Sequence, residues 1–197
     1  MMAEVIVRSL SELRDWLRAN HNTSGSVWLL RHRKGTGPTV STSDVVDELL
    51  CWGWIDSLPQ ARADGYSALR ISPRDPKSNW SKVNKDKVAR LDRAGRMQAA
   101  GRCCVDRAKA NGAWTFLDDV DALVEPPDLS AALDEKPEAR RFWNRFPPSS
   151  RRGILEWIKT ARRPETRDKR VADTVAKAMT NRKANFPAGR DAGPKGD

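Results

Sequence analysis

A chain of 197 residues, 31% charged and 39% hydrophobic, has the composition of one soluble globular domain, or of one domain with a small helical extension. No apolar run approaches the ~20 residues that a membrane-spanning helix needs. The start MMAEVIVRSL lacks the basic and apolar pattern of a signal peptide, and three cysteines are not typical of a disulfide framework. We therefore expect a cytoplasmic protein with no membrane insertion.

The net charge is +10, and it is unevenly distributed along the chain. Residues 62–109 and 151–190 each carry a net charge of +8, whereas residues 112–140 carry −6. A positive charge of this size attracts polyanions such as nucleic acid, an anionic membrane surface or phosphorylated ligands. A solvated surface with no such partner has the same composition, so both interpretations stay open. The acidic block either solvates a face or pairs with a basic segment.

The first predicted elements are a short strand and a helix. EVIVR at residues 4–8 is rich in strand formers. Ser9 and Glu12 then form a capping box, in which each side chain bonds the backbone at the start of a helix. Apolar residues recur at helical spacing behind it, which predicts an amphipathic helix over residues 10–20.

A second strand and a second helix follow. Residues 26–33 read SVWLLRHR, a strand pattern, and end at the turn Gly35-Thr36-Gly37-Pro38. Ser41 and Asp44 make another capping box. It opens a helix that Gly53 ends.

The remaining pattern is a hairpin followed by helices. Strands are expected at about residues 54–61 and 66–72, with Asp64-Gly65 as the turn between them. From about residue 80 onward the apolar residues have a helical period. The predicted helices span residues 81–94, 97–111, 129–145, 149–161 and 164–180.

This order of elements predicts an α+β fold, with a small, mostly antiparallel sheet and N-terminal helices followed by a helical C-terminal half. We expect an α+β core over residues 1–120 and a helical C-terminal subdomain, packed on the core, over residues 121–183. The acidic, proline-containing region near residues 118–129 is the expected seam. Residues 184–197 have the composition of a disordered tail.

Aromatic and basic residues gather between residues 51 and 84, and this segment is the predicted site. Arginine forks, hydroxyls and a helix N-terminus are what an anion site needs, and tryptophans beside arginines can form a ligand-binding wall. Core packing, helix caps and solvated side chains would explain the same residues without a ligand. The predicted ligand-binding residues are Trp54, Asp56, Arg70, Arg74, Lys77, Ser78, Trp80 and Asn84. Either Ser78 or Ser81 is expected to cap the helix that begins near residue 80.

Asp56 is the one candidate for a catalytic residue. A carboxylate at a strand start is a general base, an orienter of an arginine or a turn cap, and structural pairing with Arg70 or Arg74 is the more common outcome. If the two strands pair as a hairpin, Asp56 and Arg70 lie near opposite each other.

Other chemistry finds little support in the sequence. His21 and His32 are the only histidines, and neither has a carboxylate or cysteine at ligand spacing, so no metal site is predicted. Cys103 and Cys104 are adjacent and do not form a CxxC redox pair. Gly35-Thr36-Gly37 lacks the lysine of a phosphate-binding loop, and we predict no cofactor.

Several short motifs stand in order along the chain: CWGWID at residues 51–56, SPR at 72–74, KSNWSK at 77–82, WIKTA at 157–161 and ETR at 165–167. Together they resemble the YdeI/OmpD-associated family, also called bacteriocin-protection proteins, over about residues 16–175. The resemblance implies a link to stress or bacteriocin resistance and to an outer-membrane porin. It supplies no catalytic residue.

The leading hypothesis is a stress-protection protein that binds a small anionic, phosphate-bearing ligand in an aromatic and arginine-rich cleft. A nucleic-acid-binding protein is the second, since the basic segments suit phosphates although no named motif is present. An enzyme with Asp56 as general base is the third. An adaptor whose C-terminal helices hold a protein partner is the fourth.

Overall fold

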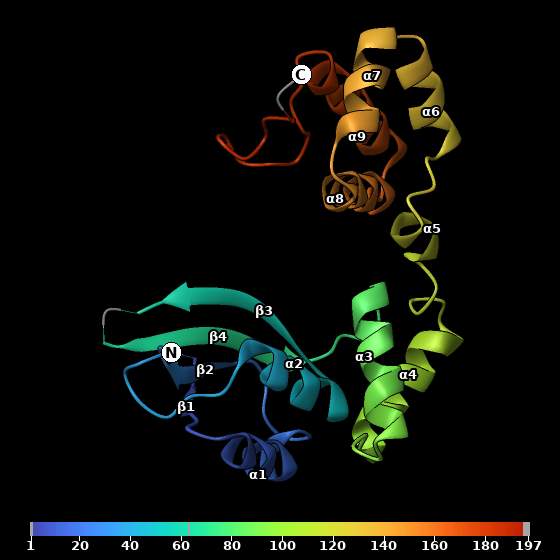
Figure 1. Ribbon diagram of the computed structural model, residues 1–197. Helices are drawn as coiled ribbons and strands as arrows, with labels where there is room; N and C mark the ends of the chain where they lie inside the picture. Colours follow the sequence, from blue (N-terminus) through green and yellow to red (C-terminus); the bar gives the residue numbers. More distant parts are fainter. Residues whose placement is uncertain (1, 63, 195–197) are drawn as a thin grey trace. The chain divides into compact units, whose positions relative to one another are not determined.

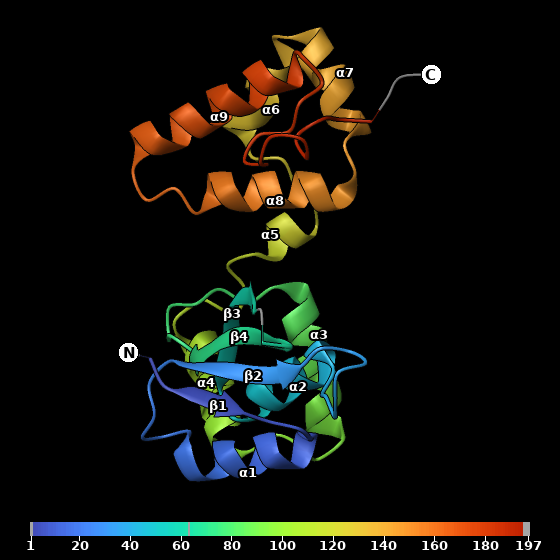
Figure 2. The same cartoon turned by 90° about the vertical axis from the view of Figure 1, so that its left-hand side faces the viewer.

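The chain forms two compact units, Met1–Phe116 and Leu117–Asp197 (Figures 1 and 2). The structure is a computed structural model that describes residues 2–62 and 64–194. Its backbone is 48% helical and 14% strand.

The N-terminal unit is built on a four-stranded sheet in the order β1-β2-β4-β3. The strands are β1 (Glu4–Ile6), β2 (Val27–His32), β3 (Trp54–Ala61) and β4 (Tyr66–Pro73). β1 is parallel to β2, because the helix between them carries the chain back across the sheet. The other two strand pairs are antiparallel. The predicted α+β fold with a mostly antiparallel sheet is therefore confirmed.

Helices α1 (Leu10–Asn20) and α2 (Thr42–Cys51) share one apolar core with this sheet. The serine half of each predicted capping box opens these helices. Ser9 Oγ accepts the N–H of Glu12 at 3.1 Å, and Ser41 Oγ accepts the N–H of Asp44 at 3.0 Å. Gly53 follows α2 with a φ of 73°, a left-handed conformation that favours glycine.

Helices α3 (Lys82–Arg93) and α4 (Ala99–Ala110) complete the N-terminal unit. The first turn of α4 lies directly on the end of α2, where the N–H of Gln98 donates to the Cys51 carbonyl at 3.0 Å. Gly101 is buried at this crossing. With no side chain, it allows the two backbones to approach closely.

The C-terminal unit is helical. It contains α5 (Asp118–Asp121), α6 (Pro127–Asp134), α7 (Pro137–Arg145), α8 (Pro148–Lys159) and α9 (Pro164–Ala178). The single helix predicted over residues 129–145 was wrong, because Pro137 cannot continue a helix and instead begins a new one. No helix within residues 2–62 and 64–194 is both long and apolar enough to cross a membrane.

Residues 184–194 lie against the helices of the C-terminal unit, although their composition predicted disorder. Arg182 forms an ion pair with the buried Asp191. The N–H of Gly193 donates to the Asn181 carbonyl at 2.7 Å. Specific polar contacts therefore order a segment that has few apolar residues. The remainder of the predicted tail, residues 195–197, lies outside the described residues.

The α2–α4 crossing leads to a stability prediction for Gly101→Ala. A Cβ atom at this position would lie 2.3 Å from the Cys51 carbonyl oxygen and 2.8 Å from that of Leu50. Both are backbone atoms and cannot rotate away. We expect the free energy of unfolding to fall by about 1–3 kcal/mol, as in an overpacked core. Urea denaturation followed by circular dichroism measures this free energy of unfolding.

Gly153→Ala in α8 is the matched control. The nearest atom to its new Cβ, on the Phe186 ring, would be 4.0 Å away. Alanine is the better helix former by about 1 kcal/mol, so this variant should gain stability. A Gly101→Ala protein as stable as wild type would show that the two helices do not touch there.

Candidate functional site

The β3–β4 register separates Asp56 from Arg70. Asp56 pairs with Ile71 and not with Arg70, and the register shifts just after Asp56. Neighbouring residues on a strand point to opposite faces, so Arg70 leaves the other side of the sheet. There it is exposed, with its Nη2 3.5 Å from Ser26 Oγ. The arrangement expected from the sequence, with Asp56 and Arg70 near opposite each other, therefore differs from the structure by one residue.

Trp54 lies in the core of the N-terminal unit. Its Nε1 donates to the carbonyl of His21 at 3.2 Å. Its ring meets that of Trp16 edge-on, with 5.4 Å between the centroids. An enclosed, hydrogen-bonded indole packs the core and offers no face to a ligand.

Arg74 and Trp80 do lie together, as the sequence suggested. The Arg74 guanidinium stacks on the Trp80 indole, 3.8 Å from the ring centroid. The N–H of Arg74 donates to the Gly53 carbonyl at 2.9 Å, and its Nη2 donates to the Asn79 carbonyl at 2.6 Å. These contacts fix the arginine at the end of β4, with only 6% of its surface exposed.

The positive charge of Arg74 lacks a direct counter-ion. Its Nε and Nη1 atoms are buried without a hydrogen-bond partner, and no carboxylate among the described residues forms an ion pair with it. Burial lowers the pKa of Arg74. The electrostatic effects of Cys104 and, after it, Asp56 raise this pKa but do not outweigh burial. A buried charge without a partner costs several kcal/mol, on the order of the effective desolvation penalty of one ion. Arg74 is therefore a place where a bound anion would be stabilising.

The loop that follows Arg74 is ordered by Asp75. Its carboxylate accepts the N–H of Lys77 at 2.7 Å, and its carbonyl accepts the N–H of Ser78 at 2.9 Å. Ser81 caps α3, accepting the N–H of Asn84 at 3.4 Å. The Lys77 side chain is exposed, so it is available at the surface of this loop.

A hollow of about 440 Å³ adjoins the loop. Its walls are formed by Lys77, Asn79, Asn111, Gly112, Ala113 and Phe116. Asn79 connects the hollow to Arg74, because its carbonyl accepts the arginine and the residue itself lines the wall. Asn111 holds the opposite side in place by donating to the Pro76 carbonyl at 2.7 Å. Asp56, Arg74 and Trp80 do not themselves line this hollow. Asp56 therefore has no place for general-base chemistry there, and Arg74 is connected to the hollow only through Asn79.

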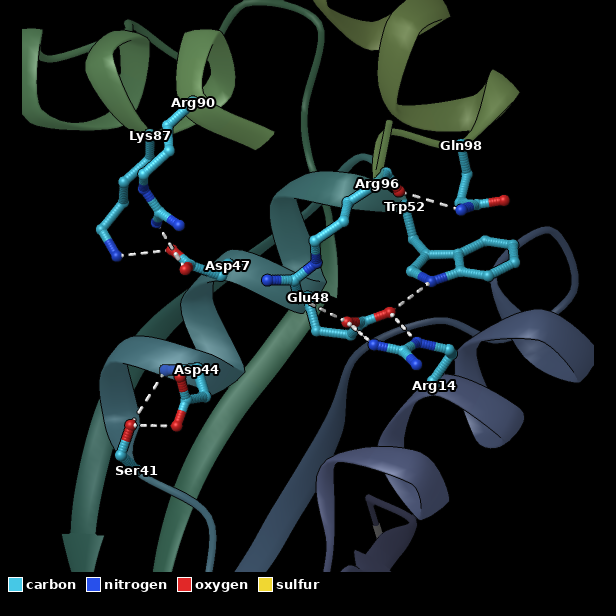
Figure 3. Close-up of polar contacts among 10 residues, drawn as sticks. All are labelled: Arg14, Ser41, Asp44, Asp47, Glu48, Trp52, Lys87, Arg90, Arg96 and Gln98. Carbon is cyan, nitrogen blue, oxygen red and sulfur yellow. Dashed lines mark hydrogen bonds and ion pairs between the residues drawn. The ribbon is translucent and has the colours of Figure 1, made fainter. Parts of the chain in front are cut away.

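The sequence analysis missed a buried acidic pair, Asp47 and Glu48, on α2 (Figure 3). Glu48 is only 2% exposed. Arg14 donates to both of its oxygens at 3.1 Å, Arg96 donates at 3.0 Å and the Trp52 indole N–H donates at 3.2 Å. Both carboxylate oxygens are thus occupied by donors from three separate segments.

Asp47 is held in the same way by Lys87 at 2.7 Å and Arg90 at 2.5 Å, both from α3 (Figure 3). Burial alone would raise the pKa of each carboxyl, but the hydrogen bonds from their cationic partners outweigh it and both pKa values are lowered. The pair is therefore ionised and fully engaged, which suits a structural role. No group of three or more metal-ligating side chains occurs in the part of the chain that the structure describes.

Two family models match the chain. Residues 5–104, just over half of the sequence, match the family described as "Domain of unknown function (DUF8412)". The chain belongs to this family. Residues 122–181, within the C-terminal unit, match the family described as "Bacteriocin-protection, YdeI or OmpD-Associated". No curated protein and no solved structure matches the chain.

The resemblance to the YdeI/OmpD-associated family is confirmed as a partial match. It covers residues 122–181 and not the longer stretch, residues 16–175, over which the motifs suggested it. The motifs at residues 51–56 and 77–82 lie instead in the part that matches the other family. All of the predicted ligand-binding residues lie there as well.

The acidic pair leads to a prediction for Glu48→Gln. The substitution keeps the shape of the side chain but leaves Arg14 and Arg96 facing a neutral amide. Removing one partner of a buried ion pair costs about 3–5 kcal/mol, so we expect a loss of that order in urea denaturation at pH 7. Asp44→Asn is the control on the same helix. Its carboxylate is exposed and bonds Ser41, and its loss should cost about 1 kcal/mol or less.

The acidic pair also predicts how stability depends on pH. Because the pKa values of Asp47 and Glu48 are lowered from ordinary values of 3.8 and 4.5, their contribution is fully present above pH 4.5. It is lost as the pH falls through the lowered values, since the unfolded chain then binds more protons. Glu48→Gln should therefore show a shallower fall of stability below pH 4.5 than wild type. Identical slopes would rule out this role for Glu48.

Proposed function

We propose that the protein binds a small, phosphate-bearing anionic ligand beside Arg74 and Trp80. The observation that carries the proposal is the buried Arg74 guanidinium, stacked on an indole with two nitrogens that lack partners. A phosphate group accepts the paired hydrogen bonds that a guanidinium fork donates. Its charge would offset the cost of burying the arginine.

The hollow next to this arginine suits the rest of such a ligand. Lys77 offers a second positive charge at its edge, and Asn79 and Asn111 place amide groups along its wall. Ala113 and Phe116 add apolar surface. Ligand sites commonly combine a mostly apolar wall with a few polar groups that set orientation.

The proposed site keeps part of the set that the sequence suggested. Arg74 and Lys77 form it, with the buried Trp80 as the ring on which the Arg74 guanidinium stacks, Ser78 in the ordered loop, and Asp56 as a neighbour that acts on the Arg74 charge. Three residues leave the set. They are Trp54 in the core, Arg70, which is exposed on the opposite face of the sheet from Asp56, and Asn84, whose backbone N–H meets the α3 cap.

The description of the family that matches residues 122–181 names bacteriocin protection. Capture of a small anion is compatible with a protective protein of this kind. The proposed site, however, lies in the other unit. It would contribute only the binding of the anion, and nothing in it requires catalysis.

Isothermal titration of the full chain with inorganic phosphate, pyrophosphate and a nucleoside monophosphate tests the proposal. Arg74→Lys keeps the positive charge but loses the planar guanidinium fork. Because one hydrogen bond to a charged group is lost, the affinity for the ligand should fall by about tenfold. Arg70→Lys is the matched control, the same substitution at an exposed arginine that lies beside Ser26 and does not line the hollow. It should leave the affinity unchanged.

Two results would contradict the proposal. One is equal affinity in wild type and Arg74→Lys. The other is tight binding of a polynucleotide that falls steeply with salt and is insensitive to both variants, which would favour the nucleic-acid hypothesis.

A further inference from the structure

Arg31 is a second buried arginine of the N-terminal unit whose charge is uncompensated. It is 8% exposed and lies on β2, opposite Ser67 near the start of β4. Arg74 immediately follows the far end of β4. Seven residues of extended strand separate Ser67 from Arg74, which corresponds to roughly 20 Å at about 3.3 Å per residue. The two arginines therefore lie at two separate positions in the N-terminal unit.

The polar contacts of Arg31 satisfy only part of its guanidinium. Nη1 donates to the Val40 carbonyl at 2.7 Å, and Nη2 donates to Thr42 Oγ1 at 3.1 Å. Nε is buried without a partner, and no carboxylate among the described residues pairs with the group. Burial lowers the pKa of Arg31, with no acidic group acting against it.

A hollow of about 340 Å³ opens beside this guanidinium. Arg31, Arg33 and Thr42 are among its lining residues, together with Gln60 and Ser67. Their side chains supply cationic groups, hydroxyls and an amide around one space. Arg33 is exposed, so a second positive charge stands at the edge.

The same hollow reaches the N-terminus of α2, because Thr42 lines it and is the first residue of that ten-residue helix. The first N–H groups of a helix have no partner within the helix, and their partial positive charge attracts anions. Ser41 already accepts the N–H of Asp44, and the Asp44 carboxylate bonds the Ser41 hydroxyl (Figure 3). Thr42 lines the hollow, whereas Asp44 does not.

We propose that this hollow is a second anion site, for a small oxyanion of which inorganic phosphate is the simplest probe. The guanidinium of Arg31 forms its charged wall. The first turn of α2 supplies N–H donors, the Thr42 hydroxyl a further polar group, and Arg33 the charge at the mouth. Binding there needs no residue of the Arg74 site and stands whether or not that site binds a ligand.

Amide chemical shifts of the ¹⁵N-labelled full chain, titrated with inorganic phosphate at constant ionic strength, test the proposal. The amides of Thr42 and Ser43 should shift and saturate. In Arg31→Lys the phosphate concentration for half-saturation should rise by about tenfold, because a lysine head cannot make the same paired contacts. Arg74→Lys should leave these shifts unchanged.

Thr42→Val provides a second arm in case Arg31→Lys does not fold. It removes the hydroxyl that lines the hollow while keeping the shape, and it should weaken the phosphate response. Thr39→Val is its control, since that hydroxyl donates to the His32 carbonyl at 2.6 Å and does not line the hollow. Absence of saturable shifts at Thr42 and Ser43, or equal responses in all four variants and wild type, would overturn the proposal.

Discussion

The buried carboxylate of Glu48 fixes the geometry of the N-terminal unit. It joins α1 through Arg14, the segment before α4 through Arg96, and the end of its own helix through Trp52. Arg14 and Arg96 are far from Glu48 in sequence, so the carboxylate is a junction of separate segments. Taking a charge out of water is costly, and it is tolerated here because both oxygens receive hydrogen bonds from cationic or indole donors.

The position of the proposed ligand site follows from this junction. Once α2 is fixed, it ends at Trp52 and the chain turns at Gly53, whose carbonyl receives the N–H of Arg74. The same turn begins β3, which sets the register of the hairpin and brings Asp56 within electrostatic reach of Arg74. An interaction on α2 therefore governs where the buried arginine stands.

The unit treats its enclosed arginines in two different ways. The half-buried Arg96, whose side chain is 33% exposed, is paired with the Glu48 carboxylate. The more deeply buried Arg31 and Arg74 bond backbone carbonyls or a hydroxyl and keep nitrogens without partners. The fold thus supplies an acidic partner to a half-buried cation but not to these two buried ones, and that contrast is the physical reason for proposing anions from outside the chain at both positions.

The features that could be predicted from the sequence are those that depend on contacts between residues close together in the chain. Ser9 and Ser41 cap the helices that their spacing predicted, and Gly53 ends α2, because these contacts are made within a few residues. The sequence could not reveal the arginine partners of Glu48, which come from segments more than thirty residues away. The expected hairpin register differs by one residue at Asp56, and the shift between Asp56 and Pro59 has no mark in the sequence.

The same distinction between local and distant contacts explains why only some of the predicted site residues lie together in the structure. Arg74 and Trp80 are six residues apart in a tight loop, so their association was accessible to sequence reasoning. Trp54 has a similar charged neighbourhood along the chain, yet its ring is enclosed by Trp16 and the carbonyl of His21 from distant positions. Trp80 is as deeply buried as Trp54, and it differs in that the Arg74 guanidinium stacks on its ring. Local composition does not distinguish a tryptophan that contacts a buried cation from one that contacts only core groups. The contacts made in the folded chain decide that.

The two family matches divide the functional question along the chain. Arg31, Glu48, Arg74 and Trp80 all fall within residues 5–104, whereas the bacteriocin-protection description belongs to residues 122–181. A description attached to one unit does not account for charges buried in the other. The proposed anion sites therefore rest on the uncompensated arginines themselves and not on that description. Any protective role suggested for the C-terminal unit has to be established there separately.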